Sequence, residues 1–436
     1  RPTDAQDVSN GAAPWQRLAY DELLAGQLAL GLVRQNMKEQ SGRSVSGDGR
    51  IRAKIMAALP FKLTGSQCTA LKEISDDLAA PHRMLRLLQG DVGSGKTVVA
   101  LMGMAAAVEA GTQAALMAPT EVLARQHAET IAPLAVEAGL TIGLLTGREK
   151  GKARDALLQR LASGEIDVLI GTHALFQSEV MFKDLGFAVI DEQHRFGVHQ
   201  RLALQAKGSN GGTNVLVMTA TPIPRTLLMT HYGDLDVSRL TEKPAGRKPI
   251  VTKAVPVESL EKLIERIRAQ LAEGAQVYWV CPLIESSEIS ELAAAEERHA
   301  HLRQIFGDTV GLLHGALPAS EKDATMAAFA ANELKILVAT TVIEVGVNVP
   351  NANIMVIEHA ERFGLAQLHQ LRGRVGRGSR ESFCMLLFKQ PLGETAKARL
   401  KMMEDTEDGF LIAEKDLELR GGGEMLGAKQ SGAPGF

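Results

Sequence analysis

The sequence predicts an α/β protein made of two lobes, each built on a parallel sheet. Short apolar runs alternate with stretches of helical periodicity, the pattern of strands joined by crossover helices. The 436 residues exceed the ~100–200 residues of one typical domain. Near the middle, Glu242–Pro249 contains two prolines and a glycine, which stop either period. We therefore expect lobe 1 to span residues 61–245 and lobe 2 residues 246–389.

Apolar runs bounded by polar or glycine-containing turns mark the expected strands. In lobe 1 these are Met84–Leu88, Ala114–Ala118, Ile142–Leu145, Val168–Gly171, Phe187–Ile190 and Val215–Met218. In lobe 2 they are Val277–Cys281, Val310–Leu313, Ile336–Ala339, Ile354–Ile357 and Phe383–Phe388.

The two ends of the chain differ in character from the lobes. Apolar residues recur at helical spacing from Trp15 to about Glu39, which predicts an amphipathic helix. The Gly- and Ser-rich segment Ser41–Gly49 then favours a flexible connector. Residues 1–60 are thus expected to form a helix and a connector. Residues 390–436, a charged helical segment and a glycine-containing tail, are expected to form a separate appendage.

The composition favours a soluble protein and excludes several classes. Hydrophobic residues make up 45% and charged residues 23%, near the averages of globular proteins. No run approaches the ~20 apolar residues of a membrane-spanning helix, and the start lacks a signal peptide, so we expect a cytoplasmic location without membrane contact. The formal net charge of −3 means that any contact with nucleic acid must be local.

The segment from Gly90 to Thr97 reads GDVGSGKT, directly after an expected strand and at the start of a helix. This is the P-loop in its required context. Gly90, Gly93 and Gly95 let backbone N–H groups wrap the phosphates of ATP at the positive end of the helix. Lys96 is expected to reach the β- and γ-phosphates, and the Thr97 hydroxyl to bind Mg²⁺.

Two carboxylates follow the expected strand Phe187–Ile190. At the carboxyl end of a parallel strand they project into the nucleotide crevice. We expect Asp191 to hold Mg²⁺ through water, and Glu192 to orient and deprotonate the attacking water.

Lobe 2 contributes a guanidinium cluster, Gln370–Arg377, which reads QLRGRVGR. Arg374 and Arg377 lie three residues apart, on one face if the segment is helical. Arginine spreads positive charge over a transferring phosphoryl group, so both are candidate catalytic fingers. A solvated basic face is the alternative.

Together these motifs resemble the superfamily 2 helicases, over residues 61–432. Further segments carry the likeness: Phe61–Gln67, Pro119–His127, Leu145–Gly147, Gly171–His173, Thr219–Thr221, His314-Gly315 and Thr340–Asn348. The resemblance implies two tandem RecA-like P-loop domains that close on ATP and Mg²⁺, with Gln67 against the adenine and Gly346 near the nucleotide. Asn348 stands where the family often has Asp.

The same resemblance implies residues that contact the nucleic acid or couple hydrolysis to movement. Thr120, Thr146, Gly147 and Thr172 would follow the strand, which suits backbone contacts that carry no sequence information. Read alone, Thr120 is also a good helix N-cap. Thr219 and Thr221 would link hydrolysis to strand movement.

Within superfamily 2, the sequence from Asp191 to Arg201 and the tail resemble the RecG-type branch-migration helicases. The tail segments are Asp408–Leu417, Leu419–Glu424 and Gln430–Gly432, which look like a translocation motif with Arg420 in the coupling loop. Gly422 and Ala428-Lys429 depart from the family pattern.

The resemblance implies an ATP-dependent DNA helicase or translocase of branched DNA, such as stalled forks and Holliday junctions. Its partners would be branched or duplex DNA, with single-stranded DNA-binding protein as a further partner, and the N-terminal wedge domain of the family is expected to be missing. Two alternatives stay open: a transcription-repair coupling translocase of duplex DNA, and a nucleotide-binding scaffold without turnover.

Overall fold

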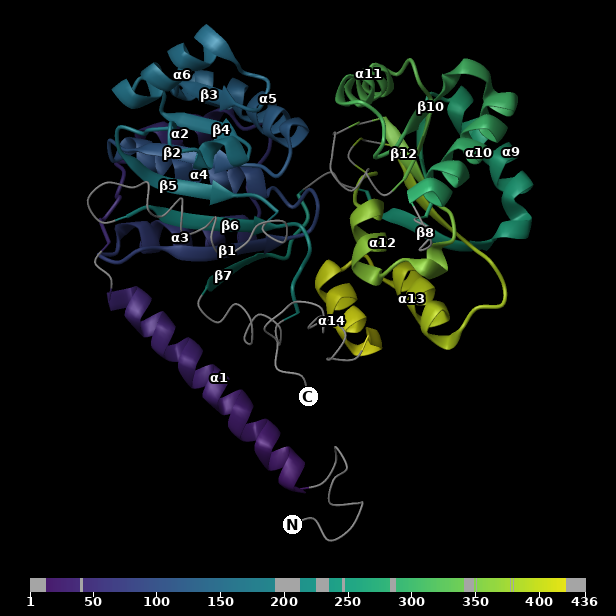
Figure 1. The fold of residues 1–436 in the computed structure, drawn as a ribbon, viewed down its shortest axis with the longest axis horizontal. Coiled ribbons are helices and arrows are strands. Elements are labelled where there is room, and N and C mark those ends of the chain that lie inside the picture. Colours follow the sequence, from purple (N-terminus) through teal and green to yellow (C-terminus); the bar gives the residue numbers. More distant parts are fainter. Residues whose placement is uncertain are drawn as a thin grey trace.

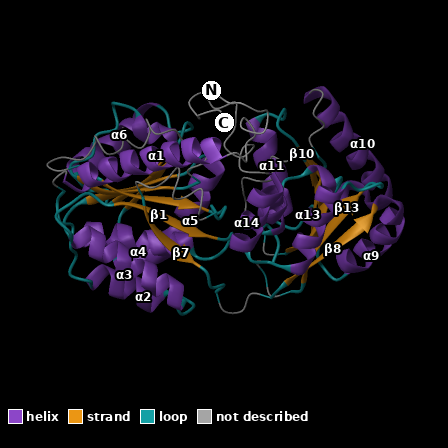
Figure 2. Ribbon diagram, turned by 90° about the horizontal axis from the view of Figure 1, so that it is seen from below, coloured by secondary structure: helices purple, strands orange, loops and turns teal. Residues whose placement is uncertain are grey.

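The computed structural model describes residues 13–39, 42–192, 212–224, 235–244, 248–282, 288–340, 349, 351–376, 378 and 380–420. These residues form two α/β lobes, each with helices on both faces of a sheet (Figures 1 and 2). The first sheet has the strand order β3-β4-β2-β5-β6-β1-β7 and the second β10-β11-β9-β12-β13-β8. All the pairings described in both sheets are parallel. The predicted fold class is confirmed.

Lobe 1 contains the helices α2 (Arg50–Ala58), α3 (Gly65–Ala79), α4 (Lys96–Glu109), α5 (Glu121–Ala138) and α6 (Gly151–Ser163). Its strands are β1 (Leu85–Gly90), β2 (Gln113–Met117), β3 (Ile142–Leu145), β4 (Val168–Gly171), β5 (Leu185–Ile190), β6 (Asn214–Thr219) and β7 (Asp236–Leu240).

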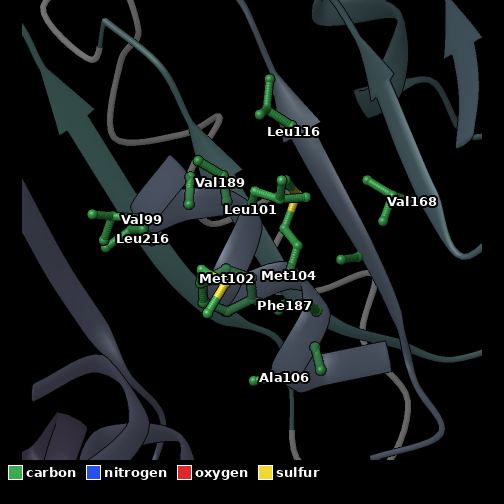
Figure 3. Close-up of a cluster of buried hydrophobic side chains, with 14 of the residues drawn as sticks. Val99, Leu101, Met102, Met104, Ala106, Leu116, Val168, Phe187, Val189 and Leu216 are labelled. Atoms are coloured by element: carbon green, nitrogen blue, oxygen red, sulfur yellow. The ribbon is translucent and has the colours of Figure 1, made fainter. Parts of the chain in front are cut away.

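Helix α4 anchors the P-loop because it is buried on nearly all sides. Every residue from Val98 to Ala107 is buried, which is the pattern of a helix enclosed in a core. Figure 3 shows Val99, Leu101 and Met104 of this helix among side chains of the sheet. At Gly103 a Cβ would approach the Phe187 ring to 3.0 Å, so glycine lets α4 lie close to β5. The start of α4 is therefore fixed relative to the strand ends.

Lobe 2 contains α9 (Leu260–Ala272), α10 (Glu288–Phe306), α11 (Ala319–Ala330) and α12 (Leu365–Arg372), followed by α13 (Glu394–Asp405) and α14 (Gly409–Arg420). Its strands are β8 (Ile250–Pro256), β9 (Gln276–Val280), β10 (Val310–Leu313), β11 (Ile336–Ala339), β12 (Ala352–Ile357) and β13 (Ser382–Phe388). The views of Figures 1 and 2 agree that α14 lies at the junction of the lobes.

Each predicted strand is present, with ends shifted by at most a few residues. Two strands were not predicted, β7 and β8, and each lies at the edge of its sheet. Both strands are only partly buried, so polar residues interrupt their sequences and neither forms an apolar run. Every described strand up to β7 belongs to the first sheet and every one from β8 to the second.

The two ends of the chain differ from expectation. Helix α1 (Ala13–Glu39) is present and stands away from the lobes in Figure 1. The expected flexible connector is instead packed on lobe 1: Val45 is 2% exposed, and its N–H donates to the Leu78 carbonyl over 2.7 Å. Arg43 also pairs with Asp184 at 2.6 Å. Residues 42–48 therefore form a segment that is docked on lobe 1.

The appendage is likewise not separate from lobe 2. Leu400 and Met403 of α13 and Ile412 of α14 are buried in the same cluster as residues of β12 and α12. Charged residues are frequent in these helices, and the sequence did not predict that their apolar residues pack against lobe 2. None of the helices described in either lobe or at the ends is long and apolar enough to cross a bilayer.

Candidate nucleotide-binding site

The P-loop connects β1 to α4 through two glycines in left-handed backbone conformations, Gly93 (φ 77°) and Gly95 (φ 85°). Gly95 is the N-cap of α4 and has no side chain to occupy the helix start. Lys96 is buried in the loop, where its Nζ donates to the carbonyls of Gly90 (2.6 Å) and Asp91 (2.9 Å). Thr97 lies on the first turn of α4. This arrangement presents N–H groups, an ammonium and a hydroxyl to an anion.

Gln67 supports the P-loop from behind. Its Oε1 accepts from the Thr64 N–H (2.9 Å), closing a capping box at the start of α3. Its Nε2 donates to the Ser94 carbonyl (2.9 Å), and a Cβ on Gly95 would lie 2.2 Å from that nitrogen. Both ends of the amide thus bind the protein, a role that was not expected, and the adenine contact stays a prediction.

The two carboxylates lie side by side at the end of β5, as expected of their sequence position. Asp191 Oδ2 is 2.7 Å from Nε2 of His127, on α5. Glu192 has a positive φ of 53°, a conformation that is uncommon outside glycine and clusters at functional sites. Its Oε2 accepts from the Ala220 N–H at 3.4 Å. His127 is the last residue of the Pro119–His127 motif, and the sequence did not predict its contact with Asp191.

The pKa values of these neighbours move in opposite directions. Burial alone would raise the pKa of Asp191, but the hydrogen bond from His127 and the charge of Lys96 hold it below its usual range. For Glu192, burial and the adjacent charge of Asp191 raise the pKa. The pair therefore combines a carboxylate that stays ionised with one that holds a proton more readily.

The segment after β6 lies against Glu192. Thr219 Oγ1 lies 3.0 Å from Thr221 Oγ1 and accepts from the Thr221 N–H at 3.2 Å. Between them, Ala220 donates to Glu192. The structure thus brings the predicted coupling segment to the predicted catalytic base.

The predicted strand-tracking residues lie at the carboxyl ends of β2, β3 and β4. Thr120 is the N-cap of α5 and accepts from the Leu123 N–H at 3.3 Å, the alternative reading of that residue. Thr146 donates to Glu149 Oε2 (2.7 Å) and Gly147 N–H to Glu121 Oε1 (2.9 Å). Thr172, at the end of β4, is 3% exposed. The Thr146 hydroxyl and the Gly147 N–H thus already donate to acidic side chains.

The arginine cluster of lobe 2 divides between two environments. Arg374 follows α12, and its charge acts on Glu192 in the other lobe. A Cβ on the preceding Gly373 would lie 2.9 Å from Val92 Cβ, so this loop abuts the P-loop. Arg372, by contrast, is 2% exposed and points into lobe 2.

Some predicted residues cannot be placed. Arg377, Gly346 and Asn348 lie outside the described residues, as does the side chain of Arg420.

Comparison with known proteins agrees with this geometry. Residues 64–230 match the DEAD/DEAH box helicase family and residues 257–379 the helicase conserved C-terminal domain. The chain is 51% identical to the ATP-dependent DNA helicase RecG of Escherichia coli K12 over 435 residues, 99% of this chain and 63% of that protein. RecG of Bacillus subtilis is 50% identical over 424 residues, 97% of this chain and 62% of that protein.

A solved structure of RecG bound to a three-way DNA junction superimposes with a TM-score of 0.81 at 44% identity, covering 94% of this chain and 54% of that one. The chain therefore spans a little over 60% of the length of these curated relatives. From the motifs, the two lobes and this identity along nearly its whole length, the chain belongs to the RecG family of helicases.

Proposed function

We propose that this chain is an ATP-driven DNA motor that acts on branched DNA, such as stalled forks and Holliday junctions. The observation that carries the proposal is the convergence of the P-loop, the Asp191–Glu192 pair and Arg374 where the two lobes meet. The relatives are named as ATP-dependent DNA helicases, and one was solved on a three-way DNA junction. We further propose a cytoplasmic location and single-stranded DNA-binding protein as a partner.

The reaction is the hydrolysis of ATP to ADP and phosphate. The P-loop N–H groups of Gly90, Gly93 and Gly95, together with Lys96, bind the phosphates of the substrate. Glu192, with its raised pKa, accepts the proton of the attacking water. Arg374 and Arg377 neutralise the charge that develops on the transferred phosphoryl group.

The residues also fit a magnesium ion. The lowered pKa of Asp191 keeps that carboxylate ionised, and Thr97 adds a hydroxyl oxygen, the hard donors that Mg²⁺ prefers. No cluster of three or more His, Cys, Asp or Glu residues suited to a metal occurs among the described residues. A site of one carboxylate, one hydroxyl and substrate phosphates suits Mg²⁺. When bound, the ion would offset negative charge on the phosphates.

We assign DNA contact to the strand-end donors Thr120, Thr146, Gly147 and Thr172. In this arrangement a DNA phosphate replaces the carboxylates of Glu121 and Glu149 on the donors of Gly147 and Thr146. Thr219 and Thr221 couple hydrolysis at Glu192 to movement of the DNA. Gln67 and Gly346 lie near the nucleotide. Arg420 acts in the loop that couples hydrolysis to movement. We retain residues 61–245 and 246–389 as the lobes and 390–436 as the translocation motif.

The test is steady-state ATP hydrolysis with no DNA and with forked, duplex and single-stranded DNA of equal length. We expect stimulation by DNA, greatest on the forked substrate, and its loss in Lys96→Ala. Hydrolysis that is absent under all conditions would favour the scaffold alternative, and equal stimulation by single-stranded DNA would argue against a branched substrate.

A further inference from the structure

One P-loop side chain, that of Asp91, reaches across the lobe interface. Asp91 Oδ1 lies 3.0 Å from Nε2 of His369 on α12, and Oδ2 accepts from the Gly409 N–H at 3.4 Å. The side chains of Asp91 and His369 are 19% and 8% exposed. A carboxylate of lobe 1 is thus enclosed by two elements of lobe 2.

The direction of these bonds follows from the chemistry of the partners. His369 Nδ1 lies 3.0 Å from Nη2 of Arg372. A guanidinium can only donate, so Nδ1 accepts and the imidazole proton resides on Nε2, facing Asp91. Donation therefore runs from Arg372 to His369 and from His369 to Asp91.

At its other end, Arg372 holds the hairpin formed by α13 and α14. Its Nη1 donates to the carbonyls of Met403 (2.7 Å) and Thr406 (2.9 Å), at the end of α13. These are carbonyls that a helix leaves without an internal partner. A continuous chain of hydrogen bonds thus joins the P-loop to the turn between α13 and α14.

Asp91 also reaches that turn directly. Gly409 is the first residue of α14, and its N–H is one of the donors that a helix start leaves unsatisfied. A Cβ at this position would lie 1.9 Å from Asp91 Oδ1, so the contact requires glycine. A negative charge at the positive end of α14 is favourable. Although burial opposes it, the hydrogen bond from His369 holds the pKa of Asp91 below its usual range.

The same residue contacts the nucleotide-binding lysine through its main chain. Lys96 Nζ donates to the Asp91 carbonyl at 2.9 Å, while the Asp91 side chain binds His369 and Gly409. If the phosphates of ATP bind Lys96, as the proposed function requires, the Asp91 carbonyl loses its hydrogen-bond donor. The peptide at Asp91 is then no longer held by Lys96. A change at the phosphates is then transmitted to α14 through one residue.

We propose that Asp91 is a positioning residue that transmits the nucleotide state of the P-loop to the α13–α14 hairpin, directly at Gly409 and through His369 and Arg372. The inference rests on the proposed function for its direction of signalling. It predicts that a change of Asp91 reduces DNA movement while ATP hydrolysis continues.

The activity test compares Asp91→Ala with Asp323→Ala in the protein. Asp323 of lobe 2 also takes part in a contact between the lobes, an ion pair with Arg148 that lies away from the hairpin. We expect Asp91→Ala to keep nucleotide affinity within about twofold, but to displace a triplex-forming strand at least about fivefold less per ATP hydrolysed, the scale of one lost charge-assisted hydrogen bond. Asp323→Ala should match the unaltered protein in both.

Substitutions at His369 test the route. Glutamine can donate at one end and accept at the other, so His369→Gln should retain most displacement per ATP. His369→Ala should fall between the unaltered protein and Asp91→Ala, because the direct contact of Asp91 with Gly409 remains. The double variant Asp91→Ala/His369→Ala should be no worse than Asp91→Ala alone, because loss of the Asp91 carboxylate already interrupts both routes.

A measurement without DNA separates this inference from the proposed function. Amide exchange at residues 409–412 should change when a non-hydrolysable ATP analogue is added, and this response should vanish in Asp91→Ala. The inference is overturned if Asp91→Ala keeps normal displacement per ATP, if it abolishes nucleotide binding, or if the exchange response persists. Absence of DNA-stimulated hydrolysis in the unaltered protein would refute the proposed function alone, since the exchange experiment still tests Asp91.

Discussion

Replacing Arg372 by alanine should destabilise lobe 2, although this arginine lies in the cluster that the sequence predicts to be catalytic. Its guanidinium is buried among α12, β8 and the end of α13, where it donates to Met403 O, Thr406 O and His369 Nδ1. Burial lowers the pKa of Arg372, which shows that enclosing its charge costs free energy. That cost is offset only while its acceptors are present.

The magnitude follows from the acceptors that alanine would leave behind. Two main-chain carbonyls and one imidazole nitrogen lose a charged donor, and each unsatisfied buried group costs about 1–3 kcal/mol. Because relief of the buried charge offsets part of this sum, we expect a net loss of about 3–5 kcal/mol in the free energy of unfolding. For a lobe of this size, each kcal/mol lowers the melting temperature by ~2–4 °C. The transition of lobe 2 should therefore fall by roughly 6–20 °C.

The assay is thermal unfolding followed by circular dichroism, with Arg380→Ala as the matched control. Arg380 also donates to a main-chain carbonyl, that of Glu273 at 2.6 Å, but it is exposed, so its loss should cost no more than about 1 kcal/mol. Arg372→Lys should fall between the two, because an ammonium lacks the planar fork that reaches several acceptors. A shift of less than 2 °C (about 1 kcal/mol by the same scaling) in Arg372→Ala, combined with lost hydrolysis, would refute this reasoning and return Arg372 to the nucleotide site.

Three further predictions concern the motor itself. Glu192→Gln should keep ATP binding while turnover falls ~10²-fold or more. Because the pKa of Glu192 is raised, its ionised form destabilises the fold above that pKa, and protonation removes this cost as the pH falls. The variant should therefore also be slightly more stable than the unaltered protein at neutral pH. The same raised pKa should place the acid limb of the turnover profile above ~4.3, the ordinary glutamate value, and a limb at or below it would argue against Glu192 as the base. A chain ending before Pro244 should fold and bind ATP but barely hydrolyse it, because Arg374 is absent, and full turnover would remove lobe 2 from the mechanism. Arg420→Ala should retain DNA-stimulated hydrolysis but lose triplex displacement, and a parallel fall in both would end the coupling role of that residue.

The interior of each sheet could be predicted because it leaves a simple record in the sequence. A strand buried on both faces, such as β5, must be apolar throughout, and the P-loop glycines mark a strand-to-helix turn with few alternatives. Strands β7 and β8 leave no such record, because they are only partly buried and polar residues interrupt their sequences. The other two edge strands, β3 and β10, are apolar and were predicted. For the docked segment around Val45, composition indicated flexibility, but a single buried side chain and a few main-chain bonds fix it in place.

The site was predictable where chemistry dictates residue type and unpredictable where topology chooses partners. Arg372 and Arg374 are both arginines of one motif, yet Arg372 is buried within lobe 2 whereas the charge of Arg374 acts on Glu192 of lobe 1. The partners of Asp91 and Asp191 lie 278 and 64 residues away in sequence. Neither spacing contains a local signal, so only the folded arrangement of helices identifies His369 and His127.

The parallel pairing of the sheets also sets an order of assembly during synthesis. Strand β1, which carries the P-loop, pairs only with β6 and β7, so Leu85 waits for Val215, 130 positions later (215 − 85). In lobe 2, Ile250 of β8 waits for Ser382, 132 positions later (382 − 250). Contacts this distant in sequence form late, because closing a long loop costs entropy before any contact rewards it. On the ribosome, β1 would therefore be made before every other described strand of its sheet and would be one of the last to find its neighbours. Nascent chains that end between residues 90 and 214 would then be open to chaperones and proteases.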